Sequence, residues 1–179
     1  MKQNKEQHVG LDSHCLSYLL DGIAGVSCPT DSLAQERISL LRIWFYRPGT
    51  FYITETVLAE VAQIRDIYRR ELHDGFINSL FLDYPVRIRA EVKNRAKEFE
   101  TYHPKHNDCL ILAEAEELNL DILLSYDNDF LKRLSNVSEI TRLMKPVDYW
   151  VSLNIPKGSQ PVTVPHHTNP LSKETWWVH

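Results

Sequence analysis

The chain of 179 residues has few of the features that mark secreted or membrane-embedded proteins. It holds three cysteines, Cys15, Cys28 and Cys109, whose spacing matches no metal motif, and such sparse thiols favour a reducing compartment. The polar segment 1–7 offers no apolar signal-peptide core, and no apolar run reaches the length of a membrane-spanning helix. We therefore expect a cytoplasmic protein with no membrane partner.

The chain also lacks a strong basic charge. Its formal net charge is −4 at pH 7, so a nucleic-acid partner would depend on local basic patches around the site. Apolar residues make up 43% and charged residues 25%, which are ordinary values for a globular domain with a sizeable core. We expect one domain over residues 1–150 and a proline-rich polar tail over residues 151–179. The terminal pair Trp176-Trp177 is expected to pack on this domain or on a neighbouring subunit.

Short apolar segments alternate with stretches of helical periodicity. The expected strands are residues 7–11, 51–53, 80–86, 120–124 and 139–144, and the stretches between them carry apolar residues three and four apart. Residues 120–124 are apolar at nearly every position, which is typical of a strand buried between two layers of helices. The alternation predicts the α/β class, with a parallel sheet in a three-layer α/β/α sandwich.

One segment, residues 106–130, combines the clearest helix with the clearest strand. Asn107 is a suitable N-cap and Asp108 suits the first turn of the helix that follows. Apolar side chains at positions 109, 110, 112, 113 and 115 predict one buried flank, which would leave Glu114, Glu116 and Glu117 outside.

Acidic residues recur where strands end or helices begin. Asp12 follows the first strand, Glu60 lies in the opening turns of a helix whose buried stripe is expected over residues 58–68, and Asp108 opens the helix just described. Asp127 and Asp129 follow the buried strand. These positions meet at one edge of a parallel sheet, where open α/β folds bind their ligands. A single acid of this kind is more often a helix cap or a solvated charge, so the inference depends on their joint placement.

Converging carboxylates have a specific chemical consequence. Several of them cannot all stay ionised near neutral pH without a counter-cation. A set of oxygen ligands without cysteine or histidine suits Mg²⁺ or Mn²⁺ rather than Zn²⁺. Such an ion activates a water and stabilises a leaving oxygen, which is the chemistry of metal-assisted phosphodiester hydrolysis.

Four segments, taken in order, resemble the motifs of the PIN-domain family of metal-dependent nucleases, especially its VapC-like toxins from bacterial toxin–antitoxin pairs. They are Leu11-Asp12-Ser13, the segment Thr54-Glu55-Thr56-Val57-Leu58-Ala59-Glu60-Val61, Asn107-Asp108 with its apolar continuation, and Leu123-Leu124-Ser125-Tyr126-Asp127-Asn128-Asp129-Phe130. The resemblance covers about residues 9–150. It implies a short parallel sheet of four or five strands, an acidic Mg²⁺ or Mn²⁺ site and endoribonuclease activity.

The resemblance also implies the roles of individual residues and partners. Asp12, Glu60, Asp108 and Asp127 would be the catalytic and metal-binding acids, with Asp129 as an accessory metal ligand. Ser13 and Ser125 would orient these acids or a water. The partners would be an RNA substrate, a small antitoxin protein and a second copy of the chain in a homodimer.

Two other function classes compete with this interpretation. A PIN-like module that binds RNA or protein without cleavage would be favoured by an altered set of acids, whereas here the set is complete. A phosphoryl-transfer enzyme or receiver domain built around Asp12 is less well supported. A haloacid-type phosphatase needs a second acid two residues after the nucleophile, where His14 stands, and a receiver needs a late lysine, for which only Lys145 is available.

Several side chains near the motifs each have a functional and a structural interpretation. His103 and His106 could contact phosphate or shuttle a proton, although loop histidines without a role are commoner. Lys105 could line a groove for RNA, and surface solvation is the commoner outcome for such a charge. Tyr126 could stack on a base or pack inside the fold.

Overall fold

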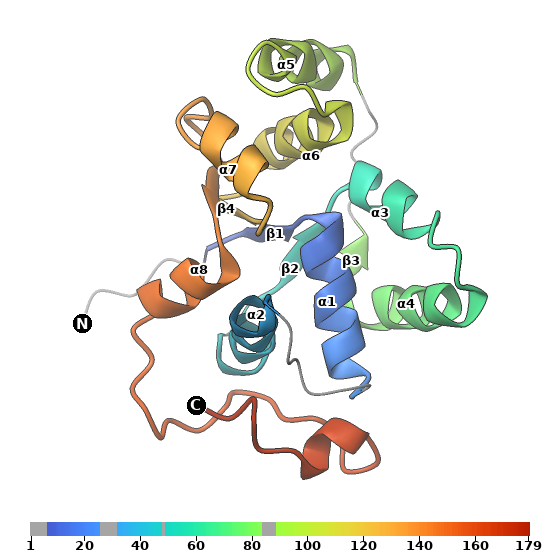
Figure 1. Ribbon diagram of the computed structural model, residues 1–179, viewed down its shortest axis with the longest axis vertical. Coiled ribbons are helices and arrows are strands. Elements are labelled where there is room, and N and C mark those ends of the chain that lie inside the picture. Colours follow the sequence, from blue (N-terminus) through green and yellow to red (C-terminus); the bar gives the residue numbers. More distant parts are fainter. Residues whose placement is uncertain (1–6, 26–31, 48, 84–88) are drawn as a thin grey trace.

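The computed structural model describes residues 7–25, 32–47, 49–83 and 89–179 (Figure 1). Its five strands are β1 (Val9–Leu11), β2 (Phe51–Ile53), β3 (Leu82–Asp83), β4 (Ile122–Leu124) and β5 (Arg142–Met144). They lie in the order β3-β2-β1-β4-β5, and every neighbouring pair is parallel. The predicted parallel sheet of four or five strands is therefore confirmed. The chain runs outward from β1 in both directions, so a crevice opens beside the carboxyl ends of β1 and β4.

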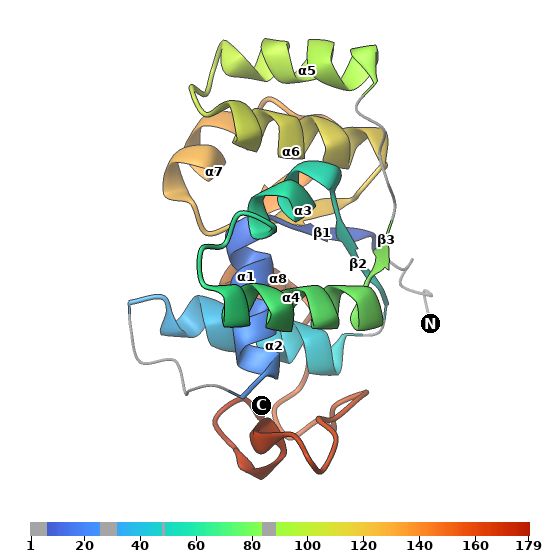
Figure 2. The same cartoon turned by 90° about the vertical axis from the view of Figure 1, so that its right-hand side faces the viewer.

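Helices cover both faces of this sheet. They are α1 (Ser13–Ile23), α2 (Ala34–Tyr46), α3 (Glu55–Val61), α4 (Ile67–Leu80), α5 (Ala90–Glu100), α6 (His106–Glu117), α7 (Asn128–Leu134) and α8 (Pro146–Ser152), with a 3-10 helix η1 at Pro170–Lys173. Figure 2 shows α5 and α6 on one side of the sheet and α1 and α2 on the other. This arrangement confirms the predicted three-layer α/β/α sandwich. In the described residues, no helix is long and apolar enough to cross a membrane.

The central strands form the middle of the core. Val9, Leu11, Leu123 and Leu124 are all fully buried, as expected for strands covered by helices on both faces. Gly10 has a packing role, because a β-carbon there would lie 2.7 Å from a δ-carbon of Leu120. The Leu120 and Leu123 side chains thus fill the space beside Gly10, and a β-carbon there would require Leu120 to shift.

The helix expected over residues 58–68 is wrong as a single element. α3 ends at Val61, and α4 begins at Ile67 after Asp66, whose carboxylate accepts a hydrogen bond of 2.9 Å from the Arg69 amide. The predicted buried stripe therefore breaks, and Tyr68 is 86% exposed. Asp66 is a good N-cap, and its local hydrogen bond favours a new helix over continuation of the old one.

A polar cluster attaches α4 to α1. Arg69 donates two hydrogen bonds to the Asp21 carboxylate, and Nε2 of the fully buried His73 lies 2.8 Å from the same group. Burial works to raise the pKa of Asp21, but the hydrogen bonds of His73 and Arg69 outweigh it and lower that pKa below its ordinary value. The cluster thus stabilises the ionised form of Asp21 in the folded protein.

The polar flank of α6 differs from the prediction. Glu117 is exposed as expected, whereas Glu114 is fully buried and Glu116 is 7% exposed. The Glu114 carboxylate accepts hydrogen bonds from the amide and hydroxyl of Thr56, in the first turn of α3. Arg95 of α5 pairs with Glu116 at 2.7 Å. Periodicity could not reveal these contacts, because α5 and α3 cover the flank of α6 that would otherwise face solvent.

Other sequence expectations differ at the boundaries of elements. The final strand begins at Arg142 rather than near residue 139, and the third strand begins at Leu82 rather than at residue 80. Residues 84–86 of the expected third strand lie outside the described residues, as does Cys28. Cys15 and Cys109 are free and buried.

The tail after α8 packs on α2 at the end of the molecule opposite α5 (Figures 1 and 2). Trp177 is 5% exposed, and its ring lies 4.6 Å from that of Phe45. Arg42 donates hydrogen bonds to the carbonyl groups of Trp177 and Val178. Asn169 donates a hydrogen bond of 2.7 Å to the carbonyl of Ile23. The Trp177 side chain therefore packs on its own chain.

Candidate active site

Two of the predicted acids come directly from the ends of neighbouring parallel strands. Asp12 follows β1 and caps α1, with its Oδ1 atom 2.6 Å from the Cys15 amide. Asp127 lies beyond β4 and caps α7 by accepting hydrogen bonds from the Asp129 and Phe130 amides. Because β1 and β4 are adjacent and parallel, both acids lie at the same edge of the sheet.

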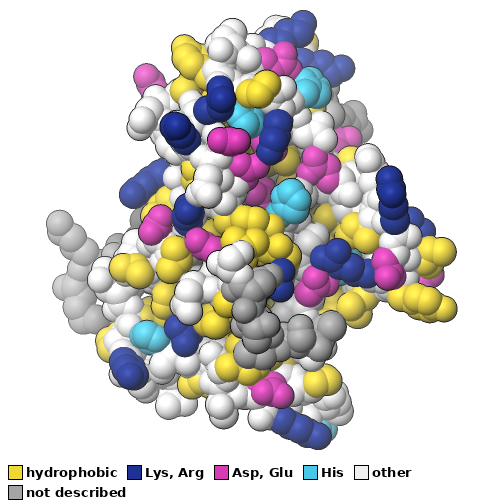
Figure 3. All heavy atoms as spheres, in the orientation of Figure 1, with side chains coloured by type: hydrophobic (Ala, Val, Ile, Leu, Met, Phe, Trp, Pro, Cys, Tyr) yellow, Lys and Arg dark blue, Asp and Glu magenta, His cyan; other side chains and the backbone are white. Residues whose placement is uncertain are grey.

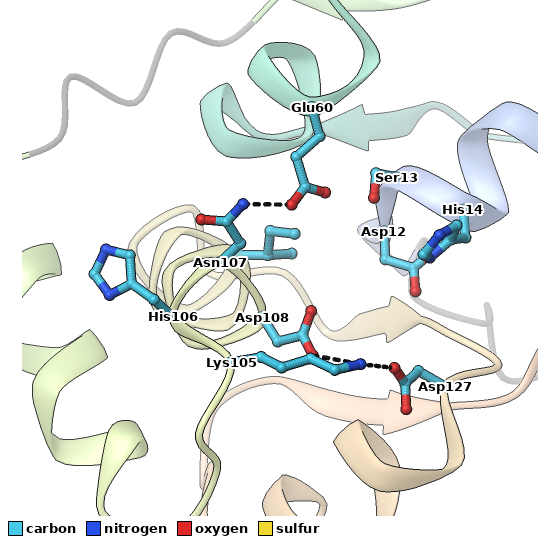
Figure 4. Close-up of a pocket in the computed structure, with 10 residues that line it drawn as sticks. Asp12, Ser13, His14, Glu60, Lys105, His106, Asn107, Asp108 and Asp127 are labelled. Carbon is cyan, nitrogen blue, oxygen red and sulfur yellow. Dashed lines mark hydrogen bonds and ion pairs between the residues drawn. The ribbon is translucent and has the colours of Figure 1, made fainter. Parts of the chain in front are cut away.

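A pocket of about 360 Å³, here called the acidic pocket, opens at this edge (Figure 4). It is lined by Asp12, Ser13, His14, Glu60, Lys105, His106, Asn107, Asp108, Ile111 and Asp127. The structure therefore brings Asp12, Glu60, Asp108 and Asp127 together from four segments of the chain. Asp129 is exposed in the first turn of α7 and does not line the pocket. The catalytic and metal-binding roles of the four pocket acids, and the accessory role of Asp129, stay predictions.

Asp12 is the most enclosed of these acids, with 5% of its surface exposed. Burial raises its pKa above the ordinary value, although hydrogen bonds from the Ser125 hydroxyl and the Cys15 amide work in the opposite direction. The fully buried Ser125 hydroxyl oxygen also accepts a hydrogen bond of 3.1 Å from the Asp127 amide. Ser125 thus links the segments that carry Asp12 and Asp127.

Helix α6, which carries Asp108 in its first turn, begins earlier than expected. α6 starts at His106 with Lys105 as its N-cap residue, so the prediction that Asn107 caps this helix is wrong. Asn107 lies within the first turn, and its side-chain amide donates a hydrogen bond of 2.6 Å to Glu60 (Figure 4). This contact joins the first turn of α6 to α3 and orients the Glu60 carboxylate at the pocket.

Lys105 is the basic side chain that reaches between the acids. Its Nζ atom lies 2.5 Å from Oδ2 of Asp127 and 3.8 Å from Oδ2 of Asp108 (Figure 4). The hydrogen bond with Asp127 is the main cause that raises the pKa of Lys105. Partial burial works to raise the pKa of Asp127, but Lys105 and the two α7 amides lower it overall. The sequence predicts a solvated surface charge or an RNA groove for Lys105, and its i,i+3 spacing to Asp108 is the signal that could have indicated the contact with that acid.

His103 supports Asp108 from behind the pocket. Its ring is 1% exposed and stacks on Phe130, and Nε2 lies 2.7 Å from Oδ2 of Asp108. From the sequence, His103 is more simply interpreted as a loop histidine without a role. Its burial could not be predicted, because it depends on contact with Phe130, which is distant in sequence. Tyr126 has the packing role considered above, since its ring stacks on that of Tyr18 at 5.2 Å.

The donor chemistry of the acidic pocket fits a hard divalent cation. Four carboxylates line it, and the only lysine or arginine side chain among its lining residues is Lys105. Oxygen donors of this kind suit Mg²⁺ or Mn²⁺. In the described part of the chain, however, no three histidine, cysteine, aspartate or glutamate side chains are grouped closely enough to hold a metal ion. The acids instead engage Lys105, Asn107 and His103, and a cation would have to displace the Lys105 ammonium group from Asp127.

Comparisons with known proteins agree with this architecture. A chain in the crystal structure of FitAcB from Neisseria gonorrhoeae is similar in fold, with a TM-score of 0.52 and 13% sequence identity. The match covers 77% of this chain and 97% of the other. The search among curated proteins gave no match. The family model described as PIN domain matches residues 11–135, a range that contains all five predicted acids. Since this match spans most of the parallel sheet and its acidic edge, the chain belongs to the PIN-domain family.

Proposed function

We propose that this protein is a metal-dependent endoribonuclease that hydrolyses RNA phosphodiester bonds. The observation that carries the proposal is the convergence of Asp12, Glu60, Asp108 and Asp127 on one pocket at the carboxyl edge of the sheet. Membership of the PIN-domain family, whose members are generally metal-dependent nucleases, supports it.

The four pocket acids would hold Mg²⁺ or Mn²⁺, with Asp129 as an accessory ligand at the margin. When bound, the cation would supply an activated water and would stabilise the leaving oxygen. Ser125 holds Asp12 in place, Asn107 holds Glu60, and His103 holds Asp108. These contacts fix the carboxylates before substrate arrives, which reduces the reorganisation that the reaction requires.

The proposed biological role is that of the toxin in a toxin–antitoxin pair. It rests on the resemblance of the four motifs to VapC-like toxins. A small antitoxin would shield the acidic pocket, and the toxin would act in the cytoplasm as a homodimer. Copurification with a small protein that suppresses cleavage would support this role.

Cleavage of total RNA with Mn²⁺ or Mg²⁺, beside an EDTA control, tests the nuclease proposal. Asp108→Asn should reduce cleavage at least about a hundredfold, as removal of one transition-state contact does in other enzymes. Asp148→Asn is the matched control, because Asp148 is an exposed acid on α8 outside the pocket. Circular dichroism would establish that both variants fold. A folded parent protein that cleaves no RNA with either metal would contradict the proposal.

The second candidate is a PIN-like module that binds RNA or protein without cleavage. It is favoured by one observation: the acids in the described residues are held by Lys105, Asn107 and His103 rather than grouped as a metal site. Calorimetry with Mn²⁺ separates the two candidates. Absence of both metal binding and cleavage would favour the module.

A further inference from the structure

A second groove lies beside the acidic pocket, on the side of α5. It has a volume of about 460 Å³ and is lined by Lys93, Lys97, Glu100, His106 and Leu110. His106 lines both the groove and the acidic pocket, so the two cavities lie side by side. In Figure 4 the ring of His106 points away from the acids, from the first turn of α6. A polymer could therefore extend from one cavity into the other across this residue.

The cations of this groove differ from their neighbours on α5. Arg95 is paired with Glu98 and Glu116, and Arg89 is paired with Glu117. Lys93 and Lys97 are exposed, and within the described ranges the ammonium group of neither residue makes a hydrogen bond or an ion pair. Two unpaired ammonium groups can bind an anion without first breaking an internal contact. Figure 3 shows basic side chains at this end of the molecule, over α5.

The spacing and the floor of the groove suit an extended polyanion. Lys93 and Lys97 are one helical turn apart, which places their β-carbons roughly 5–6 Å from each other on one face. The Glu100 carboxylate makes a hydrogen bond with Nδ1 of His106. Leu110 contributes a partly buried apolar surface at the base. Lysine side chains at the edge of such a groove can bind the phosphates of a single strand, while the apolar surface at its base can contact the bases or sugars.

We propose that this groove binds the sugar-phosphate backbone of single-stranded RNA on one side of the bond to be cleaved. The inference rests on the proposed function, and it adds the path by which substrate reaches the acids. Lys93 and Lys97 contact phosphates, and the adjacency of the two cavities at His106 places the strand beside the acidic pocket. Because Lys93 and Lys97 concentrate positive charge at one place, they also explain how a chain of net charge −4 can bind a polyanion.

The test measures binding of a fluorescein-labelled single-stranded RNA by anisotropy over a range of salt concentrations. Asp108→Asn serves as the parent so that the RNA stays intact, and Lys93→Ala and Lys97→Ala are combined on it. The matched control combines Lys157→Ala and Lys173→Ala, two exposed lysines of the tail. Loss of two phosphate contacts should lower the slope of log affinity against log salt by about 1.4. If affinities converge near 1 M salt, that corresponds to about tenfold weaker binding at 0.15 M.

The outcomes separate this inference from the nuclease proposal. Equal slopes and affinities for the groove variant and the tail control would overturn the inference, while cleavage by the unmodified protein would still stand. Unchanged RNA binding with weaker binding of a polyglutamate peptide would assign the groove to an acidic protein segment instead. No RNA binding by the parent, together with no cleavage by the unmodified protein, would overturn both. Thermal melts should match, because substitutions of exposed side chains away from special contacts change stability little.

Discussion

Replacement of Lys105 by methionine should tighten the binding of Mn²⁺ to the acidic pocket. The ammonium group of Lys105 contacts Asp127 and Asp108, two of the acids that would hold the cation. Metal binding must displace this internal cation or tolerate its repulsion. Methionine keeps much of the aliphatic stem and removes the charge.

The size of the effect follows from the two ion pairs. The Lys105 side chain is 55% exposed, so each pair is treated as a surface interaction. Such pairs contribute about 0.2–1 kcal/mol each, and two together contribute about 0.4–2 kcal/mol. That free energy corresponds to roughly a two- to thirtyfold lower dissociation constant for the metal.

Isothermal titration calorimetry of EDTA-treated, dialysed protein with Mn²⁺ measures this change. Lys105→Arg retains the cation and should bind the metal much as the unmodified protein does. Lys132→Met removes an exposed charge from α7 outside the pocket and controls for net charge alone. Unchanged or weaker metal binding by Lys105→Met would refute the idea that Lys105 competes with the cation.

Three further predictions concern the contacts around the site. Glu114→Ala should cost about 1–3 kcal/mol in urea unfolding, because it leaves the buried amide and hydroxyl of Thr56 without their acceptor, and Glu114→Gln should cost less. A loss no larger than that of an exposed glutamate variant would contradict this. The lowered pKa of Asp21 means that its ionised form stabilises the fold above the unfolded value of 3.8, and this contribution is lost as pH falls through the folded pKa. As the pH is lowered below about 4, the unfolding free energy of Asp21→Asn should therefore fall less steeply than that of the unmodified protein, as measured by urea titration at each pH. Identical dependence of unfolding free energy on pH in the two proteins would argue against a role for the pair with His73. Trp177→Ala should weaken the anchor of the tail by about 3 kcal/mol and expose residues 151–179 to trypsin before residues 1–150. Simultaneous digestion of both parts would contradict the predicted domain boundary.

Much of the fold was predictable because its signals are local. The apolar segments β1 and β4 are followed at once by Asp12 and, three residues on, by Asp127, and each acid caps the next helix. Parallel pairing then brings them to one edge. The same logic located Asp108 and Glu60 near that edge, although the exact start of α6 was two residues earlier than expected.

Contacts between elements distant in sequence were not predictable in this way. The burial of Glu114 depends on Thr56, which lies 58 residues away, and that of Glu116 depends on Arg95 of α5. The split between α3 and α4 came from one capping aspartate, which a long apolar stripe concealed. Burial of a charged side chain becomes tolerable only when a partner is in place, and periodicity carries no information on that partner.

The sequence by itself determined the class of fold, the order of its strands and helices along the chain, and the acids that stand at their junctions. These follow from hydrophobic periodicity and capping chemistry, which act over a few residues. Only the tertiary structure decided that Lys105 lies between Asp108 and Asp127, that His103 supports the pocket, and that Trp177 packs on α2. The reason is physical: side-chain partners are selected by the packing of whole layers, which brings together residues that no local pattern connects.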